Sequence, residues 1–202
     1  MALQTFPAFA ASQGIDVGSV SIEPTDLPKS ELIEKMLNED GDVAAMFGYV
    51  TTISAAARGI GIDPARLRFI NYRDALPDFY GSALMVSRDF HSNHHDVVAS
   101  VVRAINRGVM LTVQDPAAGI SALVKRAPDV GRATELERLI GTLSGEMSHP
   151  ETSELGYGDA NDERLTAAIA LLCRSKGLAR IPATNEIFTR QFLPPASKRT
   201  PV

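Results

Sequence analysis

The sequence predicts an α/β fold, and two patterns carry that prediction. In the first 78 residues, short apolar runs of strand length alternate with amphipathic stretches of helical length, as in a partly parallel sheet with helices on its faces. Beyond Pro77, one more strand-like run is followed almost entirely by helical periodicity. The composition fits a folded chain, because 45% of the 202 residues are hydrophobic and 22% are charged.

The expected strands are short apolar runs bounded by glycine or turn residues. They cover residues 20–22, 42–47, 67–71 and 82–87. The expected helices place apolar residues three and four positions apart. They cover residues 3–14, 29–38, 51–58, 97–109, 116–127, 136–143 and 162–176. Pro116 favours a helix start at its N1 position, and Gly177 favours a helix end.

Charge and hydropathy exclude several functional classes. The net charge is −4 and lysine and arginine gather in no stripe, so we expect no nucleic-acid partner. No window approaches the roughly 18 continuous apolar residues of a membrane span, and we expect none. Cys173 is the one cysteine, so the chain has no internal disulfide.

Two segments are candidates for binding a small molecule. Gly48, Tyr49, Thr51 and Thr52 lie where an expected strand meets a helix, so backbone N–H groups and hydroxyls could hold an anion or polar solute. The alternative is that Thr51 only caps its helix. Residues 71–80 set aromatic rings beside carboxylates, as in clefts between lobes; the alternative there is a polar loop with buried tyrosine anchors.

The histidines at 91, 94 and 95 do not predict a metal centre. His91 and His95 could share a helix face only if Ser92 and Asn93 were already helical, whereas those residues are typical of a helix cap. We therefore expect solvated residues near a helix N-terminus. The sequence also lacks a nucleophile elbow, a phosphate loop and a dinucleotide fingerprint, and we expect no catalytic residue.

The order of several segments resembles the NMT1/Thi5-like group of periplasmic substrate-binding proteins. The resemblance rests on the strings FPAFAASQGID, DVAAMFGYVTT, YRDALPDFYGSALMVSRDF, VVRAINRGVMLTVQDPAAGISALVKRAP and PATNEIFTRQFLPP, and it runs from about Thr5 to Pro195. It implies a type II periplasmic binding protein fold, in which two α/β lobes close over a solute and deliver it to an ABC permease. The solutes of this group include sulfonates, taurine, nitrate and thiamine-pyrimidine precursors.

The resemblance also implies a domain plan and a set of ligand-binding residues. Residues 1–78 would form the second lobe, 79–195 the returning strand and helices of the first lobe, and 196–202 a loose tail. The implied ligand-binding residues are Phe47, Gly48, Tyr49, Thr51, Thr52, Tyr72, Asp74, Tyr80 and Gly81. No cofactor or metal is expected, because such a protein captures its solute without chemistry.

The chain departs from the family pattern at its beginning. Members start with a signal peptide and a run of first-lobe elements before a segment like FPAFA, so we expect a truncated product, a misassigned start or a deliberate fragment. Apolar faces such as Val98, Val101 and Ile105 would then lack their usual cover and favour self-association. The resemblance implies a periplasmic location, although the first residues carry no export signal.

Two other functions stay open. The eukaryotic branch of the group makes the thiamine pyrimidine and is associated with a cysteine-rich iron-binding string, whereas this chain has a single cysteine. The other alternative is an interaction module that no longer serves transport. Ligand identity is open as well, because the aromatic and acidic residues of 72–80 favour a pyrimidine or amine, and the helix at Thr51 favours a sulfonate, phosphate or carboxylate.

Overall fold

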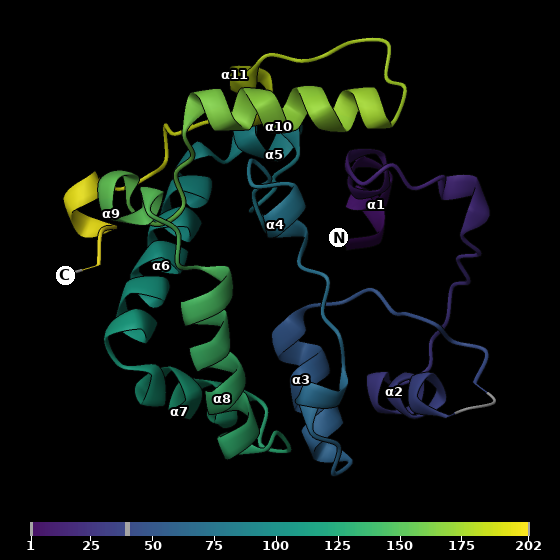
Figure 1. Ribbon diagram of the computed structural model, residues 1–202. Coiled ribbons are helices and arrows are strands. Elements are labelled where there is room, and N and C mark those ends of the chain that lie inside the picture. Colours follow the sequence, from purple (N-terminus) through teal and green to yellow (C-terminus); the bar gives the residue numbers. More distant parts are fainter. Residues whose placement is uncertain (1, 39–40, 202) are drawn as a thin grey trace. The chain divides into compact units, whose positions relative to one another are not determined.

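The computed structural model describes residues 2–38 and 41–201, and every regular element in that part of the chain is a helix (Figure 1). The chain divides into two compact units. Unit 1 comprises Met1–Pro77 and Leu171–Ala179, and unit 2 comprises Asp78–Ala170 and Arg180–Val202. The assignment of residues 1–78 and 79–195 to two lobes stays a prediction.

Unit 1 contains four α-helices and two 3-10 turns within the described residues of 2–77. They are α1 (Ala2–Ser12), η1 (Val17–Ser19), α2 (Lys29–Leu37), α3 (Val50–Gly59), η2 (Pro64–Arg66) and α4 (Tyr72–Ala75). Helices α2 and α3 pack together through Ile33, Ile53 and Ala57, all of them buried. The apolar spacing that predicted these two helices is therefore the spacing that forms this core.

Unit 2 is built mainly from consecutive packed helices. Its elements are α5 (Arg88–Asn93), α6 (His95–Gln114), α7 (Pro116–Arg126), α8 (Arg132–Gly141), a π-helical turn η3 (Thr142–Glu146), α9 (Glu151–Leu155), most of α10 (Asp162–Ser175), α11 (Thr184–Ile187) and η4 (Ala196–Lys198). Helix α6 packs on α7, and α7 packs on α8 (Figure 1). The turn into α7 begins as expected, since Asp115 accepts a hydrogen bond from the Ala118 amide at 2.9 Å and Pro116 follows at N1.

The expected strands do not form in the described residues. Segments 20–22, 42–47, 67–71 and 82–87 carry no strand assignment, so the α/β class is not confirmed. Terminal residues of two of these segments do have extended backbone: Val20 has φ −107° and ψ 116°, and Asn71 has φ −82° and ψ 120°. Local propensity thus gives the extended conformation, but a strand also needs a neighbouring strand that exchanges backbone hydrogen bonds with it.

The end of the chain is anchored in unit 2 by a buried arginine. Arg199 is 4% exposed, and its guanidinium donates hydrogen bonds to the Pro194 carbonyl (2.7 Å), the Tyr157 carbonyl (3.1 Å) and the Asp159 carboxylate (3.2 Å). The Tyr157 amide in turn donates to the Arg199 carbonyl at 2.8 Å. The prediction assigned 196–202 to a loose tail; the structure anchors the part that it describes, up to 201, and residue 202 lies outside the described residues.

Candidate functional site

Two of the predicted ligand-binding residues lie in an aromatic cluster of unit 1. The Phe47 ring meets the Phe6 ring edge-on with centroids 5.4 Å apart, and the Tyr72 ring stacks on Phe9 at 4.7 Å with 10° between the planes. Phe6 and Phe9 are buried, while Phe47 and Tyr72 are half-buried. Burial raises the pKa of the Tyr72 phenol. Helix α1 therefore supplies an apolar base on which the two predicted residues rest.

The predicted binding segment at the start of α3 has an exposed aromatic residue at its tip. Tyr49 is the N-cap residue of α3, its side chain makes no capping hydrogen bond, and it is 49% exposed. Thr51 and Thr52 lie in the first turn of the helix, so Thr51 is not the N-cap residue, contrary to the capping alternative. A Cβ on Gly48 would lie 3.0 Å from Ile53 Cδ1, so a glycine permits the approach of the chain to α3.

Tyr80, the other predicted aromatic residue, is held inside unit 2 by a polar network. Its hydroxyl donates to Glu151 Oε2 at 2.8 Å and accepts from the Asn161 amide at 2.8 Å. The Arg164 guanidinium lies over the Tyr80 ring, 4.2 Å from its centroid, and donates to Glu151 Oε2 at 3.0 Å. Arg164 also donates to the Phe79 carbonyl at 3.1 Å, so the network fixes both the ring and the backbone beside it.

Burial and the hydrogen bond to Glu151 raise the pKa of Tyr80, although the Asn161 amide and the Arg164 charge act in the opposite direction. The phenol therefore stays neutral to higher pH than a free tyrosine. Both hydrogen-bonding functions of its hydroxyl are engaged within the unit, one as donor and one as acceptor. The ring, rather than the hydroxyl, is the part of Tyr80 that could contact a solute.

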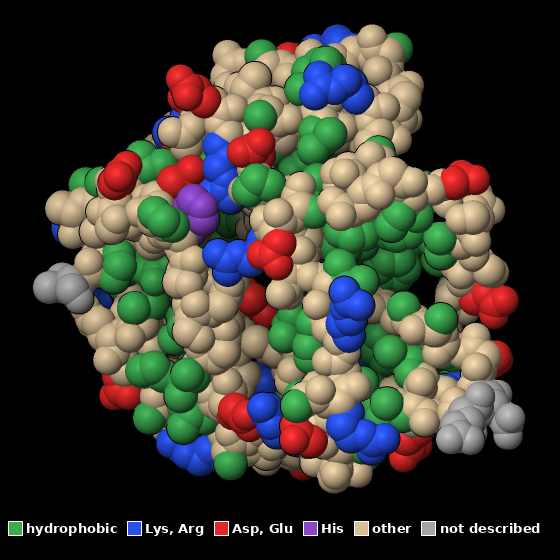
Figure 2. All heavy atoms as spheres, viewed as in Figure 1, with side chains coloured by type: hydrophobic (Ala, Val, Ile, Leu, Met, Phe, Trp, Pro, Cys, Tyr) green, Lys and Arg blue, Asp and Glu red, His purple; other side chains and the backbone are tan. Residues whose placement is uncertain are grey.

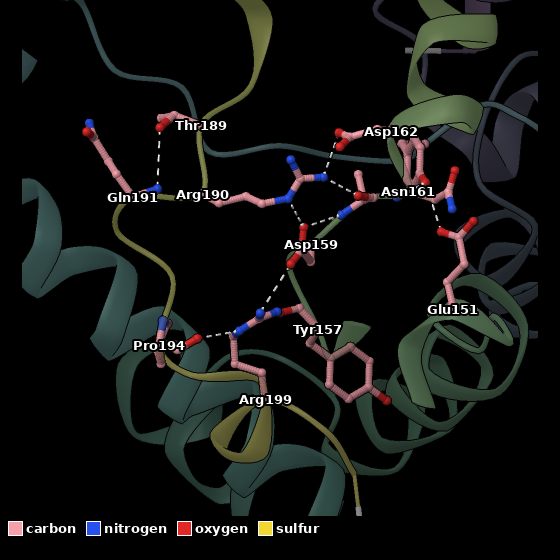
Figure 3. Close-up of polar contacts among 12 residues, drawn as sticks. Glu151, Tyr157, Asp159, Asn161, Asp162, Thr189, Arg190, Gln191, Pro194 and Arg199 are labelled. Carbon is pink, nitrogen blue, oxygen red and sulfur yellow. Dashed lines mark hydrogen bonds and ion pairs between the residues drawn. The ribbon is translucent and has the colours of Figure 1, made fainter. Parts of the chain in front are cut away.

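A second polar network lies next to the first, at the N-terminus of α10 (Figure 3). Asp159 pairs with Arg190 at 2.6 Å and with Arg199 at 3.2 Å, and Arg190 also pairs with Asp162 at 2.9 Å. Burial raises the pKa of Asp159, but the Ala160 amide and the two arginines outweigh burial, and the net effect is a lowered pKa. Hydrogen bonds to the two carboxylates raise the pKa of Arg190.

An open surface hollow borders this second network. It is lined by Leu155, Ala160, Asn161, Asp162, Glu163 and Arg190. Because the arginine is already paired with two carboxylates, the hollow does not present a ready site for an anion. Within 2–38 and 41–201, no group of three or more histidine, cysteine, aspartate or glutamate side chains is arranged to hold a metal ion, and no helix is long and apolar enough to cross a membrane.

The histidine cluster packs around one aromatic ring. The His91 and His95 rings approach the Phe192 ring at centroid distances of 5.4 and 4.6 Å, and Phe192 is 8% exposed. The His94 ring lies against the Phe90 ring in a tilted arrangement, with centroids 4.6 Å apart and 42° between the planes. His91 and His95 therefore join α5 and α6 to the segment after α11. His94 and His95 are nevertheless exposed, as the sequence led us to expect, whereas His91 is half-buried.

The structure thus places the predicted ligand-binding residues in two groups. Seven lie in unit 1, between 47 and 74, whereas Tyr80 and Gly81 belong to unit 2. Gly48, Gly81 and Asp74 are exposed. Sequence reasoning missed Glu151 and Arg164, since a separation of 71 residues or more from Tyr80 leaves no local signal. The pair Phe6 and Phe9, three positions apart on one helix, did carry a signal for an aromatic face.

Comparison with protein-family models gives a match over residues 3–119 to the family described as NMT1/THI5 like. The chain belongs to this family, and the resemblance predicted from the ordered segments is confirmed over these residues; its extension to Pro195 stays a prediction. The family includes substrate-binding proteins as well as thiamine-pyrimidine synthase-like proteins. Searches among curated proteins and among solved structures gave no significant match.

Proposed function

We propose that this chain is a solute-binding component of an ABC-type uptake system that captures a small organic or anionic solute outside the cytoplasmic membrane. The observation that carries the proposal is the family match, since residues 3–119 include all nine predicted ligand-binding residues. Capture requires aromatic and polar groups that orient a solute, and no bond needs to be made or broken.

The contacts within each unit support this function. In unit 1, Tyr49 presents an exposed aromatic ring at the start of α3, where the first backbone N–H groups of the helix lie, and Tyr72 presents a half-buried ring that stacks on Phe9. In unit 2, Arg164 and Glu151 hold the Tyr80 ring in one orientation. A ring that is fixed before binding loses little conformational entropy when a solute packs against it, which favours affinity.

Binding to the full chain tests the proposal directly. We would titrate the purified protein with taurine, an alkyl sulfonate, nitrate and a thiamine-pyrimidine precursor, using calorimetry and thermal shift. A solute at about a hundred times its Kd stabilises the folded state by about 2.7 kcal/mol, which a thermal shift readily detects. Failure of all of these solutes to bind would refute the proposal.

A matched pair of variants links binding to the predicted residues. Tyr49→Ala removes an exposed ring of the predicted site and is expected to weaken binding about tenfold. Phe90→Ala removes a comparably exposed ring on α5, outside the predicted site, and is expected to leave affinity unchanged. Recovery of the solute after incubation separates capture from catalysis: unaltered solute supports a binding protein, whereas turnover would support the enzyme alternative.

A further inference from the structure

His149 lies two residues before α9, in the connection that follows η3. Its imidazole Nδ1 accepts a hydrogen bond from the Glu151 amide at 3.2 Å, and its carbonyl accepts from the Thr152 amide at 2.9 Å. Pro150, the N-cap residue of α9, makes no side-chain capping hydrogen bond. Because the first amides of a helix have no acceptor within the helix, His149 supplies the acceptors for two of them.

The same imidazole nitrogen faces the guanidinium that covers Tyr80. Arg164 Nη1 lies 3.4 Å from His149 Nδ1 and 3.0 Å from Glu151 Oε2. An arginine N–H group can only donate, as can a backbone amide, so both groups require a lone pair on Nδ1. The hydrogen-bond network thus assigns the imidazole proton to Nε2 and leaves the ring neutral. His149 therefore contacts both of the residues that hold the Tyr80 ring.

We propose that His149 is a positioning residue for Tyr80 in the solute site. Its neutral imidazole accepts from α9 and α10 at once, and so keeps Glu151 and Arg164 where they hold the ring. A ring that is held before binding loses little conformational entropy when a solute packs on it, so this support raises affinity. The inference rests on the proposed function for the claim that Tyr80 contacts a solute, whereas the orientation of the ring does not depend on that function.

The contacts of His149 lie in a partly buried region, where a hydrogen bond has a measurable effect. The side chains of Arg164 and Glu151 are 15% and 21% exposed, and that of His149 is 40% exposed. Water therefore replaces a lost acceptor of Arg164 less readily than it would at an exposed arginine. The imidazole itself is accessible enough to exchange protons with solvent.

A proton on Nδ1 would reverse this arrangement. Nδ1 would become a donor that faces two other donors, the Glu151 amide and the Arg164 guanidinium. The imidazolium would also attract Glu151 Oε2, 4.0 Å away, which already accepts from Tyr80 and from Arg164. Figure 2 shows acidic and basic side chains interspersed on the visible face, so short-range contacts dominate there over a broad patch of one sign. Protonation would therefore hold the Tyr80 ring less firmly.

Three variants test the role of the acceptor. His149→Ala removes Nδ1, whereas His149→Asn places an amide oxygen close to the position of Nδ1 and cannot take up a proton. His94→Ala is the matched control, because His94 is another solvent-accessible histidine of unit 2 and its ring contacts Phe90 instead of the Tyr80 network. Far-ultraviolet circular dichroism of each variant shows whether the helices are kept.

The Tyr80 phenol reports its own position without any solute. Ultraviolet absorbance follows the ionisation of the tyrosines, and the step of Tyr80 is the raised one that Tyr80→Phe removes. In His149→Ala the pKa of Tyr80 should move toward its ordinary value, because burial and the Glu151 hydrogen bond, which raise it, are both weakened; the smaller opposing effect of the arginine charge does not reverse this. His149→Asn and His94→Ala should keep the wild-type step. The same Tyr80 step in wild type and His149→Ala would overturn the proposal.

Solute affinity links the position of the ring to binding. The probes are taurine, an alkyl sulfonate, nitrate and a thiamine-pyrimidine precursor. At about pH 8, His149→Ala should raise the Kd of the solute that binds by about threefold to tenfold, the effect of one hydrogen bond, and His149→Asn should restore it. Imidazole changes its charge between about pH 8 and about pH 5, so over this range the wild-type Kd should rise about threefold relative to that of His149→Asn. A ratio that does not change with pH, or equal losses in the two variants, would overturn the acceptor role.

The two measurements separate this inference from the proposed function. If none of the four solutes binds, the solute-binding function fails, and the Tyr80 titration still decides whether His149 positions the ring. If a solute binds and His149→Ala changes neither the Tyr80 step nor the Kd, the function stands and the positioning role is overturned.

Discussion

The tight packing of Gly156 against Arg199 in unit 2 gives a sharp prediction about this glycine. Gly156 has φ 76° and ψ 166°, a region of backbone space that is open essentially only to glycine. A Cβ at this position would lie 2.8 Å from Arg199 Cβ and 3.0 Å from the Arg199 carbonyl carbon. Neither atom can swing aside, so Gly156→Ala must displace the anchored end of the chain.

The cost of Gly156→Ala is the sum of two contributions. The backbone conformation contributes about 1–3 kcal/mol. Overpacking against Arg199 contributes a further 1–3 kcal/mol or so. The free energy of unfolding of unit 2 should therefore fall by about 2–6 kcal/mol. Gly158→Ala is the matched control, because Gly158 has φ 86° but its added Cβ would make only ordinary contacts at 3.5 and 3.6 Å. That control should lose about 1–2 kcal/mol.

Urea unfolding followed by far-ultraviolet circular dichroism measures both variants, since the chain has no tryptophan. Hydrogen exchange then locates the effect: the Tyr157 amide, which donates to the Arg199 carbonyl at 2.8 Å, should exchange faster in Gly156→Ala than in Gly158→Ala. Equal destabilisation by the two substitutions would refute the argument that close approach, rather than backbone conformation alone, requires glycine at 156.

Three further predictions concern the polar networks of unit 2. Arg199→Met should lower the free energy of unfolding of unit 2 by about 3 kcal/mol, as measured by urea unfolding. This value is the low end of the range for breaking a buried ion pair, because Asp159 keeps Arg190 as a partner. The pKa of Asp159 is lowered in the folded state. Its contribution to stability is therefore present above the unfolded pKa of about 3.9 and is lost as the pH falls through the folded pKa. Asp159→Asn should accordingly make the free energy of unfolding depend less steeply on pH on the acid side. Since the pKa of Tyr80 is raised, by burial first and by Glu151 second, its contribution is present below the unfolded pKa of about 10 and is lost as the pH rises through the folded pKa. Tyr80→Phe should therefore remove one raised step from an ultraviolet titration of the tyrosines and leave the raised step of Tyr72 in place.

The helices were predictable because their hydrogen bonds and apolar faces are local. The spacing of Val98, Val101, Val102 and Ile105 predicted a helix over 97–109, and α6 extends this range to His95–Gln114. Helix α7 starts at Pro116 as predicted. A helix satisfies its backbone within four residues along the chain, so the sequence of the segment alone contains nearly all of the information.

The strand predictions were not confirmed, because a strand depends on a partner segment elsewhere in the chain and not on its own sequence alone. Residues 42–47 and 82–87 have the composition of strands and lie in irregular structure, because no other segment of the described chain pairs with them. Propensity determines whether a segment is extended, and pairing determines whether it becomes a strand.

The same distinction separates what could be predicted of the candidate site from what could not. Tyr49, Thr51 and Thr52 lie within one short stretch of sequence, and their position at the start of a helix follows from the local pattern. The orientation of Tyr80 depends on Glu151 and Arg164, which come from α9 and α10 and reach it only through the fold. Because the Tyr80 hydroxyl is committed to this network, a substitution at Glu151 changes how the ring is held without touching the ring itself. Residues that position a predicted ligand-binding side chain, as Glu151 and Arg164 position Tyr80, thus leave no local signal in the sequence, even where the predicted side chain itself does.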